Sequence, residues 1–452
     1  MNLIRKGSSE LIKVGKSITI TNKLLKEIES RDVVPSDDFR VSIPDVNFQK
    51  YLIEEYNLVF IDGTVAYGDI KEIIEIKVKG LGIESLEGIQ YFTSLKVLYC
   101  QSNRLRSLDV SRNTTLELLE CMNNLLTSLD VSMNTSLLAL QCKQNLLTSL
   151  DVSMNASLLV LTCSENLLTS LVVHKNIALT VLHCHKNQLN FLGLSKNKSL
   201  TEVFCSYNEL SSLDVSANYA LLELDCRSNK ITFLDVSKNI ALTGLWCRGN
   251  QLTLLNLSKN SVLTTLSCWD NQLTYLDVTK NTTLTSLNCS VNQLTSINLS
   301  NNSALTEFSC SENQLTSIDL SKNIALTELT CSENQLASLD VSLNTALNLL
   351  RCRENQLTYL DLSKNTALNI INCSINKLKS LDVSMNTALT ELWCRGNQIT
   401  FLNISLNTVL RTISCWDNQL TSLDLSKNLL LKKIILRDNP GDWWKEIEKD
   451  EE

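Results

Sequence analysis

Cysteine recurs along this 452-residue chain at one fixed interval. All 16 cysteines belong to a single series that runs from Cys100 to Cys415, and each lies 21 residues after the one before it. Neither a disulfide framework nor a metal-binding motif spaces cysteines in this way. A constant period of this length indicates a repeat architecture, in which each repeat is one structural unit stacked against the next.

Other residues keep the same period as the cysteines. Asn follows each cysteine after three and again after thirteen residues, and Leu precedes it by five; in residues 326–346 these are Asn334, Asn344 and Leu326. That repeat reads LTELTCSENQLASLDVSLNTA and contains two similar halves, LxxLxCxxN and LxxLDVSxN. Apolar and polar residues alternate within each half, which is typical of a short strand.

Both halves have the spacing LxxLxLxxN, and the chain therefore resembles the leucine-rich-repeat family. It is most similar to the subtype with nested halves of 10 and 11 residues, which is found mainly in bacterial proteins. The resemblance covers about residues 81–440. It implies a repeat solenoid of about 17 turns that is mostly β, with strand-like segments on both faces.

The repeated residues have clear roles in such a solenoid. One turn cannot bury its own apolar face, so turns stacked at the strand spacing build a continuous core from columns of Leu, Ile and Val. Cysteine is small and apolar enough to share that core. The Asn columns fall where the chain bends, and an inward Asn can hydrogen-bond the backbone of its own turn and of the adjacent one.

The sequence divides into three regions. Residues 1–80 lack the repeat and are expected to form an N-terminal segment with a small helical cap. Residues 81–440 are expected to form the solenoid, and residues 441–452 a C-terminal cap with an acidic tail. Caps are needed because an open end of the core would be exposed to solvent.

Specific residues are expected to build these caps. Helices are predicted over residues 22–31 and 44–56, the second with Pro44 in its first turn. At the other end, Trp443 and Trp444 are expected to cover the last layer of the core.

The positions on either side of each cysteine vary from turn to turn, and both should point outward from the first strand. The second half of the repeat instead carries Asp in most turns, from Asp109 to Asp424. Variable outward positions select a partner in a solenoid, whereas fixed positions build the scaffold. The first-strand face is therefore predicted to be the recognition surface.

Tryptophan and arginine form two clusters on that face, seven turns apart: the first consists of Trp246, Arg248 and Trp269, and the second of Trp393, Arg395 and Trp416. Arg248 and Trp269 fall in one column of adjacent turns, about 5 Å apart by the strand spacing, so the guanidinium should stack on the indole. Trp and Arg are also the residues enriched in binding hot spots. Because the surrounding sequence repeats as well, block duplication is the alternative explanation. The candidate partner-binding residues are Trp246, Arg248, Trp269, Trp393, Arg395, Trp416, Arg227 and Arg353.

Three further patterns have a structural and a chemical interpretation. His183 and His185 flank Cys184 on one strand face and could share a metal, but no third ligand is evident. The Asp column could bind Ca²⁺ or, alternatively, accept hydrogen bonds from nearby backbone N–H groups. Buried thiols are inert, and a ladder holds them in poor geometry for disulfides. We therefore predict no metal site and no cofactor.

Composition narrows the class of protein. The net charge of −7 opposes binding to nucleic acid, and no apolar run is long enough to insert into a membrane. Residues 1–15 lack the apolar core of a secretory signal, so a cytoplasmic location is expected, unless a leader was removed. There is no phosphate-binding loop or nucleophile elbow, and none of the three histidines has an activating arrangement, so the chain is not expected to be an enzyme.

These patterns predict a scaffold that binds a protein through its variable strand face. A carbohydrate or cell-surface binding module, in which the tryptophans stack on sugar rings, is the first alternative. A structural spacer without a ligand is the second.

Overall fold

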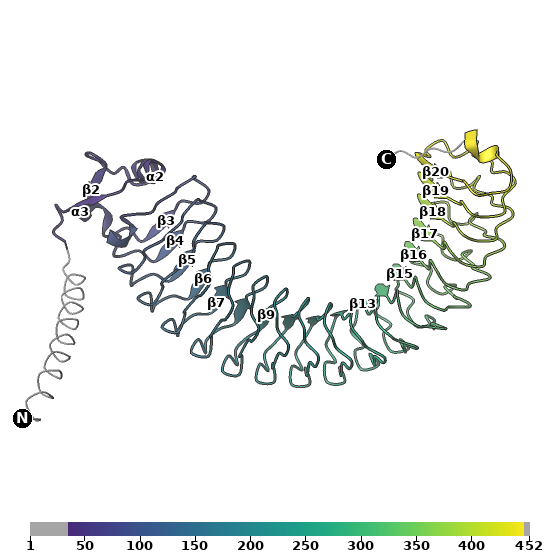
Figure 1. The fold of residues 1–452 in the computed structure, drawn as a ribbon, viewed down its shortest axis with the longest axis horizontal. Helices are drawn as coiled ribbons and strands as arrows, with labels where there is room; N and C mark the ends of the chain where they lie inside the picture. Colours follow the sequence, from purple (N-terminus) through teal and green to yellow (C-terminus); the bar gives the residue numbers. More distant parts are fainter. Residues whose placement is uncertain (1–34, 447–452) are drawn as a thin grey trace, which may run out of the picture. The chain divides into compact units, whose positions relative to one another are not determined.

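The computed structural model describes residues 35–446 (Figure 1). The first described strand is β1 Arg40–Ser42, and it is followed by α2 Val46–Tyr56, β2 Thr64–Ala66 and α3 Tyr67–Ile70. The repeat strands are β3 Glu75–Lys77, β4 Val97–Tyr99, β5 Leu118–Glu120, β6 Ala139–Gln141, β7 Val160–Thr162, β8 Val181–His183, β9 Glu202–Phe204, β10 Glu223–Asp225, β11 Gly244–Trp246, β12 Thr265–Ser267, β13 Ser286–Asn288, β14 Glu307–Ser309, β15 Glu328–Thr330, β16 Leu349–Arg351, β17 Ile370–Asn372, β18 Glu391–Trp393, β19 Thr412–Ser414 and β20 Lys433–Ile435. Residues 35–446 also contain two 3₁₀ turns, η1 Ile89–Tyr91 and η2 Trp443–Glu446.

The described residues form two compact units, which divide between Leu158 and Leu159. In the first, β3 to β6 pair in parallel and in chain order; in the second, β7 to β20 do the same. Each pair is aligned at the repeat interval, as where Leu329 lies opposite Leu350. Within the second unit the strands line the inner margin of the stacked turns, and the loops fan out on the other side (Figure 1). The parallel β-solenoid of about 17 turns confirms the predicted fold class.

Each turn buries one side of two extended segments. In the first half, the middle strand residue is buried and its two neighbours face outward, as in the pattern of β15. In the second half, Leu360 and Leu362 are buried on either side of the exposed Asp361. This segment keeps the alternation of a strand, but the parallel strands β3 to β20 occupy only the first half of each turn. The regular ladder therefore defines one face, and the second face is extended chain without that ladder.

The two Asn columns hydrogen-bond the backbone at the bends, as the sequence predicts. The buried Asn355 accepts from the backbone N–H of Leu336 at 3.0 Å and donates to the carbonyls of Cys331 and Cys352 at 3.0 and 3.3 Å. Asn365, in the second column, donates to the carbonyls of Val341 and Asn344 at 2.9 Å. Both columns thus join each turn to the one before it, and carbonyls that the bends would leave buried and unpaired acquire donors.

The residue two positions after each cysteine turns the chain through the left-handed region. Its φ is positive in every regular repeat, for example 54° at Glu333 and 52° at Ile375. Glycine occupies this position only at Gly249 and Gly396, which follow the two arginines of the Trp/Arg clusters. Since a side chain in this conformation costs free energy, the inter-turn hydrogen bonds around it must hold it there.

The cysteine column lies inside the core, as predicted. All 16 thiols are buried and none forms a disulfide. Burial raises the pKa of Cys331 to about 12, because the thiolate would lose its hydration in the apolar column. The sulfur atoms therefore act as small apolar groups.

The N-terminal cap packs on the first turn through an aromatic contact. The Asp45 side chain caps α2 by accepting from the backbone N–H groups of Asn47 and Phe48, each at 3.0 Å. Phe48 is fully buried, with its ring centroid 6.1 Å from that of Phe92. The predicted helix over 44–56 is confirmed, except that Pro44 precedes the N-cap instead of occupying the first turn. The helix predicted over 22–31 lies outside the described residues.

At the C-terminal end, η2 contacts the preceding turn of the solenoid. The Trp443 indole N–H donates to the carbonyl of Leu420 at 3.3 Å, and both Trp443 and Trp444 are half-buried. The predicted acidic tail falls largely beyond residue 446. Within the described range, no helix is long and apolar enough to cross a membrane.

We expect Asn355→Ala to destabilise the protein by about 3 kcal/mol, because the backbone N–H and carbonyl groups that it serves remain buried and each costs about 1–3 kcal/mol when unpaired. The measurement is the free energy of unfolding in urea. Thr358→Ala, at an exposed position of the same turn, is the control and should change it by less than about 0.5 kcal/mol. Equal effects of the two substitutions would contradict the role of the Asn column.

We expect the 16 thiols to be unreactive toward a thiol reagent at pH 8 in the folded protein and all to react in guanidinium chloride. A Ser338→Cys variant, which places a thiol at an exposed position, should show one fast-reacting group and serves as the positive control. Rapid reaction of the native protein would mean that the column is not in the core.

Candidate functional site

The candidate site lies on the strand face of the second unit. The residues before and after each cysteine are mostly half-buried there, with their side chains on the side away from the Leu and Cys core. All eight candidate residues lie in these two columns and within residues 159–446. The outward orientation predicted from alternation is therefore confirmed, whereas their contact with a partner stays a prediction.

The first cluster contains the predicted stack and a pocket beside it. The Arg248 guanidinium lies 4.7 Å from the centre of the Trp269 ring and donates to the Tyr207 hydroxyl at 3.1 Å. The Trp246 ring covers Gly244, where a Cβ atom would lie only 2.4 Å from it. A pocket of about 370 Å³ lies next to this ring and is lined by His185, Lys186, Phe204, Ser206, Tyr207, Asp225, Arg227 and Trp246.

The second cluster repeats the stack in different surroundings. Arg395 lies 4.8 Å from the centre of the Trp416 ring, and Arg437 lies 5.3 Å from the same ring. Trp393 donates its indole N–H to Glu391 at 3.1 Å, at the position that Gly244 holds in the first cluster. The two clusters have Trp and Arg at equivalent positions of the repeat, but the residues around them differ, and so do the surfaces that they form.

The two remaining candidate arginines are held by carboxylates of the protein itself. Arg227 makes a bidentate pair with the buried Asp225, at 2.7 and 2.6 Å. Arg353 pairs with Glu333 at 2.8 Å and with Glu354 at 2.9 Å. These pairs fix both guanidinium groups in place, so each arginine presents an oriented, partly neutralised group on the strand face.

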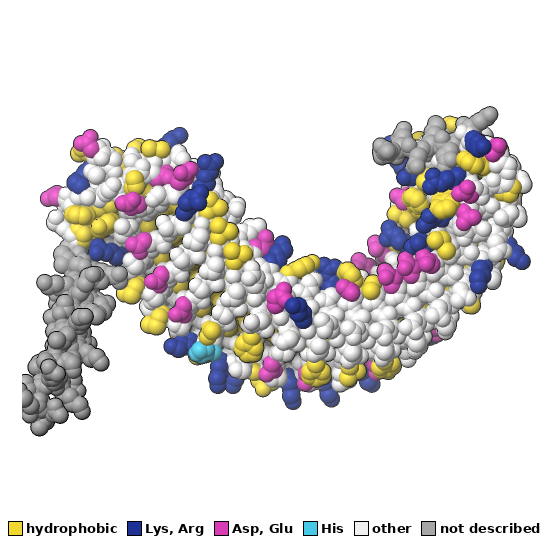
Figure 2. Space-filling model, in the orientation of Figure 1, with side chains coloured by type: hydrophobic (Ala, Val, Ile, Leu, Met, Phe, Trp, Pro, Cys, Tyr) yellow, Lys and Arg dark blue, Asp and Glu magenta, His cyan; other side chains and the backbone are white. Residues whose placement is uncertain are grey.

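An acidic group between the two clusters was not predicted from the sequence. It consists of Glu307, Glu312, Glu328, Glu333 and Glu354. Figure 2 shows acidic side chains gathered on the inner margin of the second unit, next to basic and hydrophobic ones. These glutamates occupy the columns three residues before and two residues after the cysteines, so their recurrence in three successive turns is visible in the sequence.

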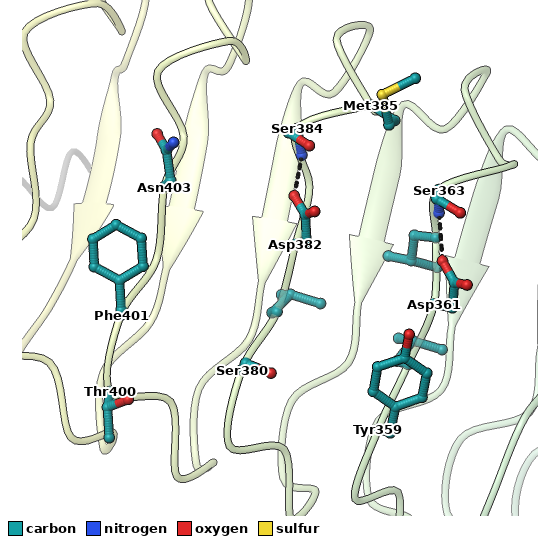
Figure 3. Close-up of a pocket in the computed structure, with 13 residues that line it drawn as sticks. Tyr359, Asp361, Ser363, Ser380, Asp382, Ser384, Met385, Thr400, Phe401 and Asn403 are labelled. Atoms are coloured by element: carbon teal, nitrogen blue, oxygen red, sulfur yellow. Dashed lines mark hydrogen bonds between the residues drawn. The ribbon is translucent and has the colours of Figure 1, made fainter.

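The histidine and aspartate patterns have structural partners. The His183 ring stacks on Phe204, with centroids 4.4 Å apart, and its Nε2 lies 3.4 Å from a Glu202 carboxylate oxygen. Asp361 and Asp382 each accept from the backbone N–H two residues later, at 2.9 Å, as expected for aspartates with a structural role in the turn (Figure 3). Across residues 35–446, no three His, Cys, Asp or Glu side chains are grouped so as to hold a metal ion.

The comparisons with known proteins point to one fold. No protein-family model matches the chain. No curated protein sequence matches it either. Among solved structures, the functional domain of InlJ from Listeria monocytogenes, described as including a cysteine ladder, is 32% identical; the match covers 85% of this chain and 77% of that one, with a TM-score of 0.65.

Two further structures are similar in fold. A leucine-rich-repeat protein from Leptospira interrogans is 24% identical over 74% of this chain and 93% of that one, with a TM-score of 0.67. The plant peptide hormone receptor RGFR1, solved in complex with RGF2, is 21% identical over 82% and 68% of the two chains, with a TM-score of 0.71.

We expect the Asp361→Asn/Asp382→Asn variant to lose less thermal stability than the wild type between pH 7 and pH 3. Hydrogen bonds from the backbone and side chains of Ser363 and Ser384 hold the pKa of these carboxyls below its usual range. A lowered pKa in the folded state contributes stability above the unfolded value, near pH 4, and that stability is lost as the pH falls through the folded pKa.

The asparagines introduced at positions 361 and 382 should keep the turn, because the native Asn403 accepts from the backbone N–H of Ser405 at 3.0 Å in the same way. The measurement is the difference in Tm between the two pH values. Glu312→Gln/Glu328→Gln changes the net charge equally at exposed positions and is the control. If both double variants behave alike, the aspartate hydrogen bonds do not contribute.

Proposed function

Since this chain belongs to the leucine-rich-repeat family, we propose that it is a binding scaffold that holds a protein partner on its strand face. The observation that carries the proposal is the pair of Trp/Arg stacks on that face, centred on Trp269 and Trp416. Each stack places a half-buried indole under a guanidinium, so the side chains are ordered before a partner arrives. Ordered aromatic and arginine side chains bind with little further loss of conformational entropy.

The charges around the stacks favour a partner with basic groups. The acidic group defined above lies between the two clusters along the solenoid, and Arg353 neutralises only part of it. A basic segment of the partner facing this group would approach faster at low ionic strength. Its apolar and aromatic groups would then contact the indoles of Trp246, Trp269, Trp393 and Trp416.

The extended fold supports a long contact. A stacked ladder offers the same two outward columns in turn after turn, so a partner can contact several strands at once. RGFR1, a receptor of the same fold, was solved in complex with the hormone RGF2. We also propose that residues 1–80 and 441–452 serve as caps of the scaffold and that the protein acts in the cytoplasm.

We expect Trp269→Ala/Trp416→Ala to weaken binding of the partner at least tenfold, because hot-spot residues at an interface cost about 2 kcal/mol or more when truncated. The partner is first isolated by affinity capture with the wild-type protein, and its Kd for purified wild type and variant is then measured by calorimetry. Unchanged affinity would exclude the two indoles as anchors.

Ile240→Ala/Ile324→Ala is the matched control, since it removes two exposed apolar side chains outside the strand face. It should leave the Kd unchanged. Melting temperatures of both variants establish that the fold is intact. A failure of the wild type to retain any protein would favour the spacer alternative.

A further inference from the structure

A second column of aromatic residues runs along the other side of the turns. Seven residues after the cysteine, five turns of the second unit carry an aromatic side chain that is 60–72% exposed: Phe191, Phe233, Tyr275, Tyr359 and Phe401. The strands lie behind the segments that bear Tyr359 and Phe401 (Figure 3), so this outer aromatic column is separate from the strand face. Exposed rings of this size in one line are unusual on a soluble surface without a ligand.

The column has a period of two turns. Its members are 42 residues apart or a multiple of 42, and the only missing step is Ser317, halfway between Tyr275 and Tyr359. The turns between them carry Ser212, Leu254, Ser296, Ser338 and Ser380. Two strand spacings amount to about 10 Å, and the loops fan outward, so neighbouring rings are at least that far apart. Trp443 falls on the next step, but it is engaged in the C-terminal cap.

Two of the intervals between aromatic residues form pockets of the same design. One, of about 680 Å³, lies between Tyr359 and Phe401, and the other, of about 460 Å³, lies between Phe191 and Phe233. Buried leucines such as Leu381 form the floor, and a serine at the intermediate turn leaves the middle open (Figure 3). Eight turns separate the two pockets, so the same surface recurs along the molecule.

The rings present their faces to solvent. Figure 3 shows the Tyr359 and Phe401 rings broadside, with the strands behind them. In the other pocket, the Phe191 ring lies against the backbone of Gly193, where a Cβ atom would be 3.1 Å from the ring. Most turns have Asp at the position of Gly193, and the loss of that side chain lets the ring lie close to the surface. A flat, exposed ring face attracts polarised C–H groups through its quadrupole.

The polar groups of the pockets suit hydroxyl groups. Asp361, Asp382 and Asn403 lie along one side of the larger pocket, with serine and threonine hydroxyls beside them. A carboxylate accepts several hydrogen bonds, so each Asp can accept from a ligand hydroxyl in addition to its backbone N–H. Neither pocket is lined by Lys, Arg or His. With a net charge of −7 and ionised aspartates at the site, an anionic ligand is disfavoured.

We propose that the outer aromatic column binds an extended neutral polysaccharide of β-1,4-linked pyranose units. Such a chain exposes axial C–H groups on its ring faces and hydroxyls at its edges, which match the aromatic faces and the carboxylates. It presents the same face at every second sugar, so equivalent contacts recur along the polymer just as the rings recur at every second turn of the solenoid. A polymer with a regular repeat can contact several of these regularly spaced rings at once, and this favours a polysaccharide over a folded protein surface.

The test is retention of the full-length protein on microcrystalline cellulose and on chitin, with elution by soluble cellohexaose or chitohexaose. Wild type should bind one of them, and Tyr359→Ala/Phe401→Ala should weaken its binding about two- to tenfold for each ring removed. Ile240→Ala/Ile324→Ala removes equally exposed apolar side chains elsewhere and should bind like wild type. No retention of wild type on either polymer, or equal retention of both variants, would overturn the proposal.

A gain of binding provides the sharper test. Ser317→Tyr fills the missing step, so it should strengthen retention on the polymer by a similar factor. Ser338→Tyr adds the same ring one turn out of phase and should not. Equal gains from both would mean that any exposed tyrosine suffices and that the two-turn period has no role.

The outcome is independent of the protein-binding proposal. Trp269→Ala/Trp416→Ala alters the strand face and should leave retention on the polysaccharide unchanged. If removing Tyr359 and Phe401 abolishes binding of a protein partner and leaves retention on the polysaccharides unchanged, the outer column is a protein contact. The glycan assignment is then wrong.

Discussion

The hydrogen bonds of the buried asparagines are the interaction on which this structure depends. A chain that turns every ten or eleven residues must bury backbone groups at each bend, and a side-chain amide can serve both donors and acceptors there. Asn355 and its equivalents connect the bend of one turn to the previous turn. The left-handed residue beside them can then be almost any amino acid, including Ile375. The outward positions are thereby free to vary without loss of the fold.

Much of the fold followed from the sequence, because its signals are repeated sixteen times. The inward direction of the cysteines, the role of the asparagines and the α2 helix could all be predicted from spacing and local chemistry. The lack of a regular ladder in the second half of the turn could not, because Leu360-Asp361-Leu362 alternates as a strand does. Whether such a segment pairs with its neighbours depends on the spacing between turns, and one sequence does not state it.

The site was only partly predictable, for a different reason. Arg248 and Trp269 could be paired because they share a column in adjacent turns, and the structure brings them together. The bidentate pair of Arg227 with Asp225 depends on side-chain rotamers. The outer aromatic column was visible in the sequence at a 42-residue period, but it skips every second turn and is hidden when each repeat is compared only with the next.

The two-turn period has a consequence for how such a chain can change in length. Duplication or deletion of a single 21-residue turn preserves the core, since every turn offers the same Leu, Cys and Asn contacts to its neighbours. It would nevertheless shift all downstream rings by half a step relative to those upstream. Insertion or deletion of two turns at a time leaves the rings upstream and downstream of the change in the same two-turn register. An odd shift, such as the seven turns between the two Trp/Arg clusters, instead aligns Phe401 with Leu254, so the repeated clusters and the outer aromatic column follow different periods along the same scaffold.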